Sequence, residues 1–310
     1  MPLNLPVIRT AAEYRAYAGI SEAEFRRLLR RGEVVAVRRG FYIPAQPLTP
    51  EQRHGCLAVA ESRALGPGAV ASHVSAGVLH ELPVPRTDLA RAWFSVPPPS
   101  HGRRRGRIVK VSVDLPEDEV FERDGVRLTA PARTVADLAR TQPLHWGVAA
   151  ADAALNRCLA TPDELRSAVE APFRHGVRRA VAAVEFADGR AQSPLESISR
   201  VQLRRAAIPD PELQFPIRLR GRVIGYADFA WPEYGVVGEC DGRIKYSQLL
   251  RDGETAADAV MREKERQNLI AQAGWWIVRW DFAFAMDAEA LGRRVRDAFV
   301  VGRPSILDAS

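Results

Sequence analysis

Lysine, cysteine and long apolar runs are all scarce in this sequence of 310 residues. No segment reaches the roughly 18 consecutive apolar residues that a membrane helix needs. The N-terminal stretch MPLNLPVIRTAAEY also lacks a basic region followed by an apolar core, which is the pattern of a secretory signal. We therefore expect a cytoplasmic protein without a membrane partner. The chain is long enough for two or three domains, each with its own core.

Cysteine occurs only at Cys56, Cys158 and Cys240, and no two of these residues are spaced as CxxC. An odd and scattered set indicates neither a disulfide framework nor a zinc site. We expect small buried thiols at these positions.

Lysine occurs only at Lys110, Lys245 and Lys264, so arginine supplies the rest of the 44 basic positions. The formal charge of +6 and the pI of 9.6 favour a polyanionic partner. Because this chain uses arginine wherever any cation suffices, each lysine is a candidate for a role that needs a compact ammonium group.

Residues 1–45 show the pattern of two helices followed by a two-stranded ribbon. Ser21 is a plausible N-cap of the second helix, Gly32 a plausible stop, and Arg38-Arg39-Gly40 the tip of the ribbon. This order predicts a winged helix-turn-helix domain that binds DNA, although a solvated arginine face has the same pattern. The candidate DNA contacts are Arg26, Arg27, Arg30, Arg31, Arg38 and Arg39.

Residues 46–185 read as a mixed α/β domain, and residues 186–310 as a third domain with the order helix, three antiparallel strands, helix, strand, helix. The overall prediction is an α+β multidomain protein. No nucleophile elbow, phosphate-binding glycine loop or HExxH helix occurs in the first two domains, so any chemistry is expected in the third.

The stretch 228-DFAWPEYGVVGECDGRIKY-246 places Asp228 and Glu239 on neighbouring predicted strands. Two carboxylates there would repel each other unless a cation neutralises them. Mg²⁺ is the natural candidate, because it takes carboxylate oxygens, water and phosphate as ligands and can activate a phosphodiester for hydrolysis. Lys245 would then stabilise the phosphate or orient the attacking water.

Simpler roles stay open for the same residues. Asp241-Gly242 is a common turn dipeptide, Glu239 could pair with a nearby arginine, and Asp228 could be a solvated residue on an edge strand. Glu196, in the first turn of a helix that begins at Ser193-Pro194, could serve only the helix dipole.

Asp228, then 239-ECDGRIKY-246 and 262-REKERQNLIAQAGWWIVRW-280, resemble the very short patch repair endonuclease-like (Vsr-like) branch of the PD-(D/E)XK nucleases. The resemblance implies a restriction-endonuclease-like α/β/α fold over residues 186–310 and DNA cleavage with Mg²⁺, or with Mn²⁺ in its place. It implies these roles: Asp228 and Glu239 as metal ligands, Asp241 as a further acid, Lys245 as the cation, Glu196 as a supporting or second-metal carboxylate, and Lys264 and Arg266 as phosphate contacts.

One position departs from that pattern. The superfamily has lysine two residues after the glutamate, where this chain has Asp241, so Lys245 would have to reach back from the end of the strand.

The segments 19-GISEAEFRRLLRRGEVVAVRRGFYIP-44, 72-SHVSAGVLHELPVP-85 and 127-RLTAPARTVADLAR-140 resemble the AbiEi-type antitoxins of type IV toxin-antitoxin systems. This resemblance implies a winged-helix reader that represses its own operon, with a cognate toxin as partner. Two hypotheses follow: a nuclease delivered to DNA by its N-terminal domain, and an antitoxin or transcriptional regulator whose nuclease-like domain does not cut.

Overall fold

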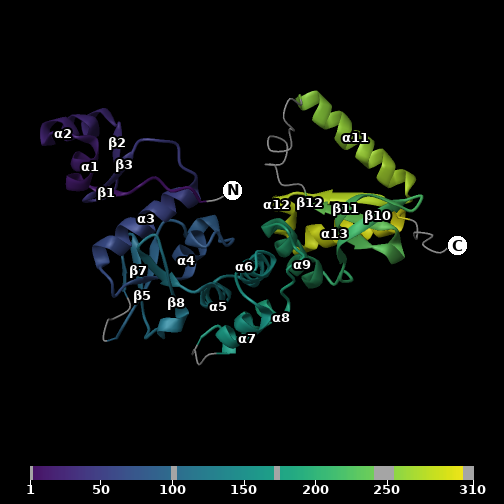
Figure 1. The fold of residues 1–310 in the computed structure, drawn as a ribbon. Helices are drawn as coiled ribbons and strands as arrows, with labels where there is room; N and C mark the ends of the chain where they lie inside the picture. The colour runs from purple at the N-terminus through teal and green to yellow at the C-terminus, as the bar shows by residue number, and fades with distance from the viewer. Residues whose placement is uncertain (1–2, 99–102, 171–174, 241–254, 303–310) are drawn as a thin grey trace. The chain divides into compact units, whose positions relative to one another are not determined.

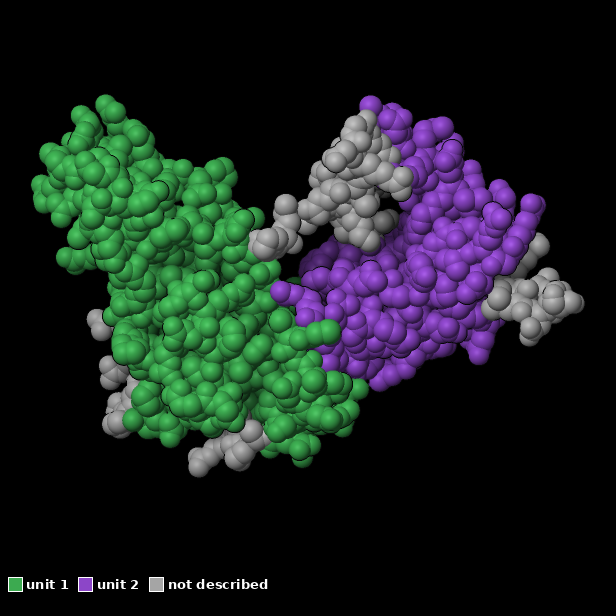
Figure 2. All heavy atoms as spheres, in the orientation of Figure 1, with its two compact units in different colours: residues 1–150, 158–185 green, residues 151–157, 186–310 purple. Residues whose placement is uncertain are grey.

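The computed structural model describes residues 3–98, 103–170, 175–240 and 255–302. The chain forms two compact units, residues 1–150 with 158–185 and residues 151–157 with 186–310 (Figure 2). The boundary between the units falls inside helix α6 (Leu144–Asn156). The division into domains 1–45, 46–185 and 186–310 stays a prediction. None of the described helices is both long enough and apolar enough to cross a bilayer.

Two short helices and a three-stranded sheet open the first unit. The helices are α1 (Ala11–Ala18) and α2 (Glu22–Arg31), and the sheet has the order β1-β3-β2, with antiparallel pairing throughout. Its strands are β1 (Arg9–Thr10), β2 (Val34–Arg38) and β3 (Phe41–Pro44). The helices and the hairpin lie where the sequence predicts them, and β1 is an additional strand.

Local signals explain the limits of α2. The Ser21 hydroxyl accepts a hydrogen bond from the backbone N–H of Glu24 at 3.2 Å, and Gly32 ends the helix at φ 71°, a conformation that glycine adopts without strain. Phe25 is buried and packs edge-on against Tyr42. The helix therefore has one face in the core and a cationic face in solvent, as predicted.

The rest of the first unit is built on a six-stranded mixed sheet with the order β6-β7-β5-β4-β9-β8. Helix α3 (Pro50–Leu65) contacts both this sheet and β2, and its buried residues Cys56, Leu57 and Ala60 belong to one core with Ile43 and Phe94. The strands are β4 (Val70–Ala71), β5 (Ala92–Val96), β6 (Arg103–Arg105), β7 (Ile108–Ser112), β8 (Val120–Arg123) and β9 (Val126–Thr129), and the helices are α4 (His73–Leu79), α5 (Pro131–Thr141), α7 (Pro162–Glu170) and α8 (Val177–Glu185).

The second unit holds a four-stranded sheet with the order β10-β11-β12-β13, in which only β12 and β13 run parallel. Helix α11 lies over one face, and α9, α12 and α13 lie over the other (Figure 1). The elements are α9 (Pro194–Arg205), β10 (Glu212–Leu219), β11 (Arg222–Trp231), β12 (Val236–Cys240), α11 (Ala256–Gln272), β13 (Trp276–Trp280), α12 (Phe282–Ala285) and α13 (Ala288–Val301). The predicted order of elements is confirmed, with α12 as an unpredicted addition.

Aromatic side chains pack against one side of β12. The indole ring of Trp280 is buried, stacks on Phe229 at a centroid distance of 5.4 Å and donates a hydrogen bond to the Ser199 hydroxyl at 2.8 Å. A Cβ atom on Gly238 would lie 2.6 Å from this indole, which is inside van der Waals contact. Only glycine therefore fits between the ring and the strand, immediately before Glu239.

Candidate functional site

Asp228 and Glu239 lie opposite each other on neighbouring strands of the second unit. The antiparallel register pairs Phe229 with Gly238, so the next pair toward the site is Asp228 and Glu239, whose side chains share one face of the sheet. The contact between Glu239 and Arg266 of α11 shows that this is the face that α11 covers. The Asp228 carboxylate also accepts a hydrogen bond from the backbone N–H of Cys240 at 2.8 Å. The sequence prediction that these two carboxylates are adjacent is thus met by the fold.

Guanidinium groups neutralise the buried Glu239 carboxylate. Arg279, its direct neighbour on β13, donates to Oε2 from Nε at 2.9 Å and from Nη2 at 2.6 Å. Arg266, from α11, donates to Oε1 at 2.5 Å. Glu263, one turn before Arg266 on α11, accepts a further hydrogen bond from Arg279 at 2.8 Å. We call Glu239, Arg266, Arg279 and Glu263 the C-terminal clamp.

The acidic and basic groups of the clamp stabilise each other's ionised forms. Burial alone would raise the pKa of Glu239, but the hydrogen bonds and charges of Arg266 and Arg279 outweigh it and hold that pKa below its ordinary value. Burial would lower the pKa of Arg266, and the carboxylates of Glu239, Glu263 and Asp228 raise it instead. The guanidinium of Arg266 thus pairs with Glu239 and is also stabilised by the charge of Asp228.

This arrangement does not fit a metal site as it stands. Both Glu239 oxygens are engaged by arginine, and no group of three or more His, Cys, Asp or Glu side chains suited to a metal ion occurs within residues 3–98, 103–170, 175–240 and 255–302. Among these residues, arginine neutralises the Glu239 carboxylate, and the Mg²⁺ expected beside the pair stays a prediction. Asp241 and Lys245 lie outside the described ranges, so their predicted roles stay predictions.

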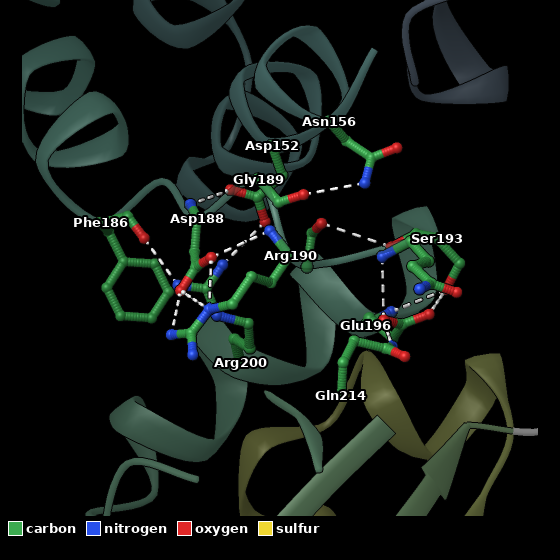
Figure 3. A network of polar contacts seen from close by, with 12 residues as sticks. Asp152, Asn156, Phe186, Asp188, Gly189, Arg190, Ser193, Glu196, Arg200 and Gln214 are labelled. Carbon is green, nitrogen blue, oxygen red and sulfur yellow. Dashed lines mark hydrogen bonds and ion pairs between the residues drawn. The ribbon is translucent and has the colours of Figure 1, made fainter. Parts of the chain in front are cut away.

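Glu196 has a capping role at the start of α9 (Figure 3). Its carboxylate accepts hydrogen bonds from the Ser193 hydroxyl at 2.7 Å, the Gln192 backbone N–H at 2.9 Å and the Gln214 amide at 3.0 Å. The Ser193 hydroxyl in turn accepts from the Glu196 N–H at 3.2 Å. These contacts account for the burial of Glu196, and its role as a metal carboxylate stays a prediction.

Gln214 links Glu196 to β10, the strand next to the one that carries Asp228. It has a left-handed backbone, φ 52°, at the position of β10 that faces Asp228, where the regular pairing with β11 is interrupted. A side chain rarely adopts this conformation without compensation. Here the hydrogen bond to Glu196 is the compensating contact, and no feature of the sequence predicted it.

A second buried carboxylate, Asp152 at the end of α6, pairs with Arg200 of α9 at 2.8 Å (Figure 3). It also accepts a hydrogen bond from the Asp188 backbone N–H at 2.7 Å. Burial raises the pKa of Asp152 to about 6, although Arg200 and that N–H favour the ionised form. The pair ties residues 151–157 to α9 within the second unit, and sequence reasoning missed it because its members lie 48 positions apart.

The predicted DNA-contacting arginines of α2 are all exposed, but three of the four have a carboxylate beside them. Arg26 pairs with Glu22 at 2.5 Å, Arg27 with Glu24 at 3.1 Å, and Arg31 lies 3.8 Å from Glu33. Among the described residues, Arg30 has no such partner. The cationic face of α2 is therefore partly neutralised by its own neighbours.

Two further arginines that were predicted to contact phosphate pair with glutamates instead. Arg38 pairs with the buried Glu61 of α3 at 3.2 Å, because the hairpin packs on that helix, while Arg39 at the tip is exposed. Arg266 belongs to the C-terminal clamp, where it pairs with Glu239 while its side chain stays 32% exposed. Lys264, on the same helix, is exposed as expected.

The first unit contains a buried ionic cluster that the sequence reasoning did not anticipate. Asp137 on α5 accepts a hydrogen bond from Arg133 at 3.0 Å and lies 3.7 Å from Arg140 and 3.8 Å from the His73 ring. The His73 ring stacks on Trp93. We call Asp137, Arg133, Arg140 and His73 the α5 cluster. The spacing of arginine four residues before and three residues after Asp137 in PARTVADLAR was the available signal.

Comparison with known proteins identifies part of the chain. A family model described as the AbiEi antitoxin C-terminal domain matches residues 53–186, which include the α5 cluster and end before α9. Two uncharacterized proteins from two strains of Mycobacterium tuberculosis are each 33% identical to this chain over 168 residues. The match covers 51% of this chain and 59% of each relative, so the chain spans little more than half the length of the curated relatives it matches. Residues 53–186 are thus similar to the AbiEi antitoxin C-terminal domain, in line with the resemblance of the middle of this sequence to that family.

Proposed function

We propose that this protein is a DNA-binding regulator of the AbiEi antitoxin type, whose C-terminal domain binds nucleic acid or a partner without cutting it. The observation that carries the non-catalytic part is the C-terminal clamp. Arginine donates hydrogen bonds to both oxygens of Glu239, and the charge of Arg266 also attracts Asp228. The positive charge that a metal ion would supply to Glu239 is therefore already present. The match of residues 53–186 supports the antitoxin part.

The N-terminal helices and hairpin would bind DNA in this proposal. A cationic helix and an adjoining basic hairpin are the parts that a winged helix-turn-helix domain places against the duplex. Arg30 and Arg39 are exposed, and no ion pair joins either of them to another described residue, so they are the best-placed phosphate contacts. Repression of the protein's own operon is the regulatory role that this architecture implies, and a cognate toxin is the partner that the antitoxin region implies.

A metal-dependent endonuclease is the second candidate function. The observation in its favour is the placement of Asp228 opposite Glu239 on adjacent strands, which brings two hard oxygen ligands together. Mg²⁺, or Mn²⁺, would have to displace Arg266 from the pair. Asp241, Lys245 and Glu196 would complete the site in this alternative.

One experiment separates the two candidates. Purified protein is incubated with labelled duplex, mismatched and single-stranded DNA in Mg²⁺, Mn²⁺ or EDTA, beside Asp228→Ala and Glu239→Ala. The regulator predicts duplex binding in a gel shift, no metal-dependent cutting and the same background in all three proteins. Cutting that needs the metal and disappears in both variants would establish the nuclease instead.

The antitoxin role needs its own test, because DNA binding alone is common to both candidates. Growth is measured in cells that express a toxin of a type IV toxin-antitoxin system, with and without the full chain. We expect the chain to restore growth, and Arg30→Ala/Arg39→Ala to weaken repression of the operon. Unchanged toxicity in the presence of folded protein would contradict the antitoxin proposal.

A further inference from the structure

The β10–β11 hairpin carries three exposed arginines that neither candidate function uses. Arg218 and Arg222 lie on the two strands, and Arg220 lies in the turn that joins them. No ion pair or side-chain hydrogen bond connects any of the three to another described residue. They differ in this from most arginines of α2, which have a glutamate beside them.

The sequence on both sides of the turn contains no carboxylate beside these arginines. The 15 residues from Leu213 to Ala227 contain these three arginines and no Asp or Glu. A local charge of +3 with no carboxylate between Leu213 and Ala227 is a stronger cationic signal than the net charge of +6 spread over 310 residues.

The backbone gives this part of the molecule the shape of a narrow ribbon. Among the described strands, β12 pairs with β11 only from Phe229 to Trp231, whereas β10 pairs with β11 down to Leu219 and Arg222. The tip residues Arg220 and Gly221 both have left-handed backbones, φ 51° and 76°, which is typical of the tight turn that matches the twist of a two-stranded hairpin. The major groove of DNA admits a two-stranded β-ribbon of this kind.

We infer that the β10–β11 hairpin is a second DNA-contacting element, in which Arg218, Arg220 and Arg222 bind phosphate oxygens of a duplex. This inference rests on the proposed DNA-binding function and extends it to the second unit. Guanidinium groups suit phosphate because they donate two parallel hydrogen bonds as well as charge. The contacts are to the backbone, so the hairpin adds affinity and salt dependence and leaves sequence reading to other residues.

The test uses the full chain and fluorescence anisotropy with a labelled duplex of about 30 bp over a range of NaCl concentrations. The variant is Arg218→Ala/Arg220→Ala/Arg222→Ala. We expect its Kd to rise at least about tenfold. The slope of log K against log salt, which is negative, should become less steep by about 2–3, roughly one for each phosphate that the variant no longer binds. The triple Arg→Lys variant should stay within about threefold of the wild type, since it keeps the charges.

The matched control removes the same charge elsewhere in the second unit. Arg190, Arg204 and Arg293 are exposed but pair with Asp188, Asp210 and Glu289, so the triple alanine variant at these positions should change Kd by less than about threefold. Equal effects of the hairpin and control variants on affinity and salt slope would overturn the inference. Displacement of the duplex by single-stranded RNA at equal concentration would overturn the choice of duplex DNA. Unfolding midpoints of all variants identify any that fail to fold. If the alanine variant does, the triple Arg→Gln variant at the same positions, which also removes the three charges, takes its place.

A further variant separates this inference from the proposed function. If the wild type binds duplex and only Arg30→Ala/Arg39→Ala weakens it, the hairpin inference fails while the N-terminal proposal stands. If only the hairpin variant weakens binding, the hairpin inference stands and the N-terminal assignment is wrong. Absence of duplex binding by the wild type would overturn both.

Discussion

Each unit of this protein holds a buried carboxylate between two arginines, and the two arrangements differ in how they are built and how open they are. In the α5 cluster, Asp137 and its two arginines come from one helix, and the arginine side chains are only 4% and 5% exposed. In the C-terminal clamp, Glu239 meets Arg266 and Arg279 from two other elements, and these side chains are 32% and 28% exposed. The α5 cluster is closed to water and the clamp is open to it.

This difference separates a structural role from a site where ligands can exchange. A closed ionic cluster cannot take up another ion without unfolding its surroundings, and breaking it leaves a buried charge without a counter-ion. An open clamp can exchange a guanidinium for another cation, or release one partner to water at lower cost. The comparison therefore favours a stabilising role for the α5 cluster and assigns any ligand chemistry to the C-terminal sheet.

The largest expected effect comes from breaking the closed cluster. Asp137→Asn removes the charge that Arg133 and Arg140 share, and we expect a loss of about 3–5 kcal/mol in the free energy of unfolding of the first unit. Hydrogen exchange of peptides from α4 and α5 measures it. Glu117→Gln is the control, because Glu117 pairs with Arg127 at the surface, is 84% exposed and should cost less than about 1 kcal/mol. A loss below about 1 kcal/mol in Asp137→Asn would contradict the structural role.

Breaking the open clamp should cost less. Glu239→Gln keeps the shape of the side chain but removes its charge, and Arg266 and Arg279 can then turn to water. We expect a loss of about 1–3 kcal/mol, the range for hydrogen bonds to charged groups, measured by exchange of peptides from β12 and β13. A loss as large as that of Asp137→Asn would show that exposure of the arginines does not distinguish the two sites.

The two units should also respond differently to mild acid. Burial lowers the pKa of His54 and of His73, so both stay neutral in the fold while the unfolded chain takes up protons below about pH 6.5. The first unit should therefore lose stability as pH falls from 7 to 5.5, by less than about 1.4 kcal/mol per group and pH unit.

The second unit should not follow this trend. The lowered pKa of Glu239 keeps the clamp ionised at pH 5.5, so its contribution is lost only in stronger acid, below the ordinary glutamate range. Asp152, with its pKa raised to about 6, works in the opposite direction, since the fold binds its proton before the unfolded chain does. Hydrogen exchange at pH 7.0 and 5.5, corrected for intrinsic rates, checks both units together. An equal loss of stability in the two units would contradict this predicted difference in their response to acid.

The smallest expected effect is on salt dependence. Ions screen exposed charges far more than buried ones. The cost of Glu239→Gln should therefore shrink when NaCl is raised from about 0.05 to 0.5 M, while the cost of Asp137→Asn should change by less than the experimental error. Unfolding of both variants at the two salt concentrations makes the comparison, with the wild type as reference.

Local sequence signals predicted the elements well and the site only in part. Ser21, Gly32 and the Phe25 stripe gave α2 because capping and periodicity act within a few residues. The opposite placement of Asp228 and Glu239 followed from alternation along two short strands. An arginine partner for Glu239 was one of the alternatives left open, but which arginine was not predicted, because Arg266 and Arg279 lie 27 and 40 positions from Glu239 and reach it only through the pairing of β12 with β13 and the path of α11.

Two other contacts could not be predicted from the sequence for the same reason, because the tertiary fold and not a local pattern brings their partners together. Arg38 at the predicted wing pairs with Glu61 because the hairpin packs on α3, a contact that no local pattern encodes. The Gln214 contact with Glu196 depends on an interruption of the β10–β11 pairing. The α5 cluster was visible as charge spacing on one helix, but only the fold shows that this helix face is buried.

The glycine beneath the indole of Trp280 limits how this sheet can evolve. We expect residue 239 to tolerate the loss of its charge, so that a lineage of such chains could gain or lose this carboxylate by single substitutions at that position. Residue 238 has no such freedom, because any side chain there would collide with the ring 2.6 Å from its Cβ and push the strand away from the core. A library of variants over residues 236–240 should therefore recover many residue types at 239 and almost none but glycine at 238.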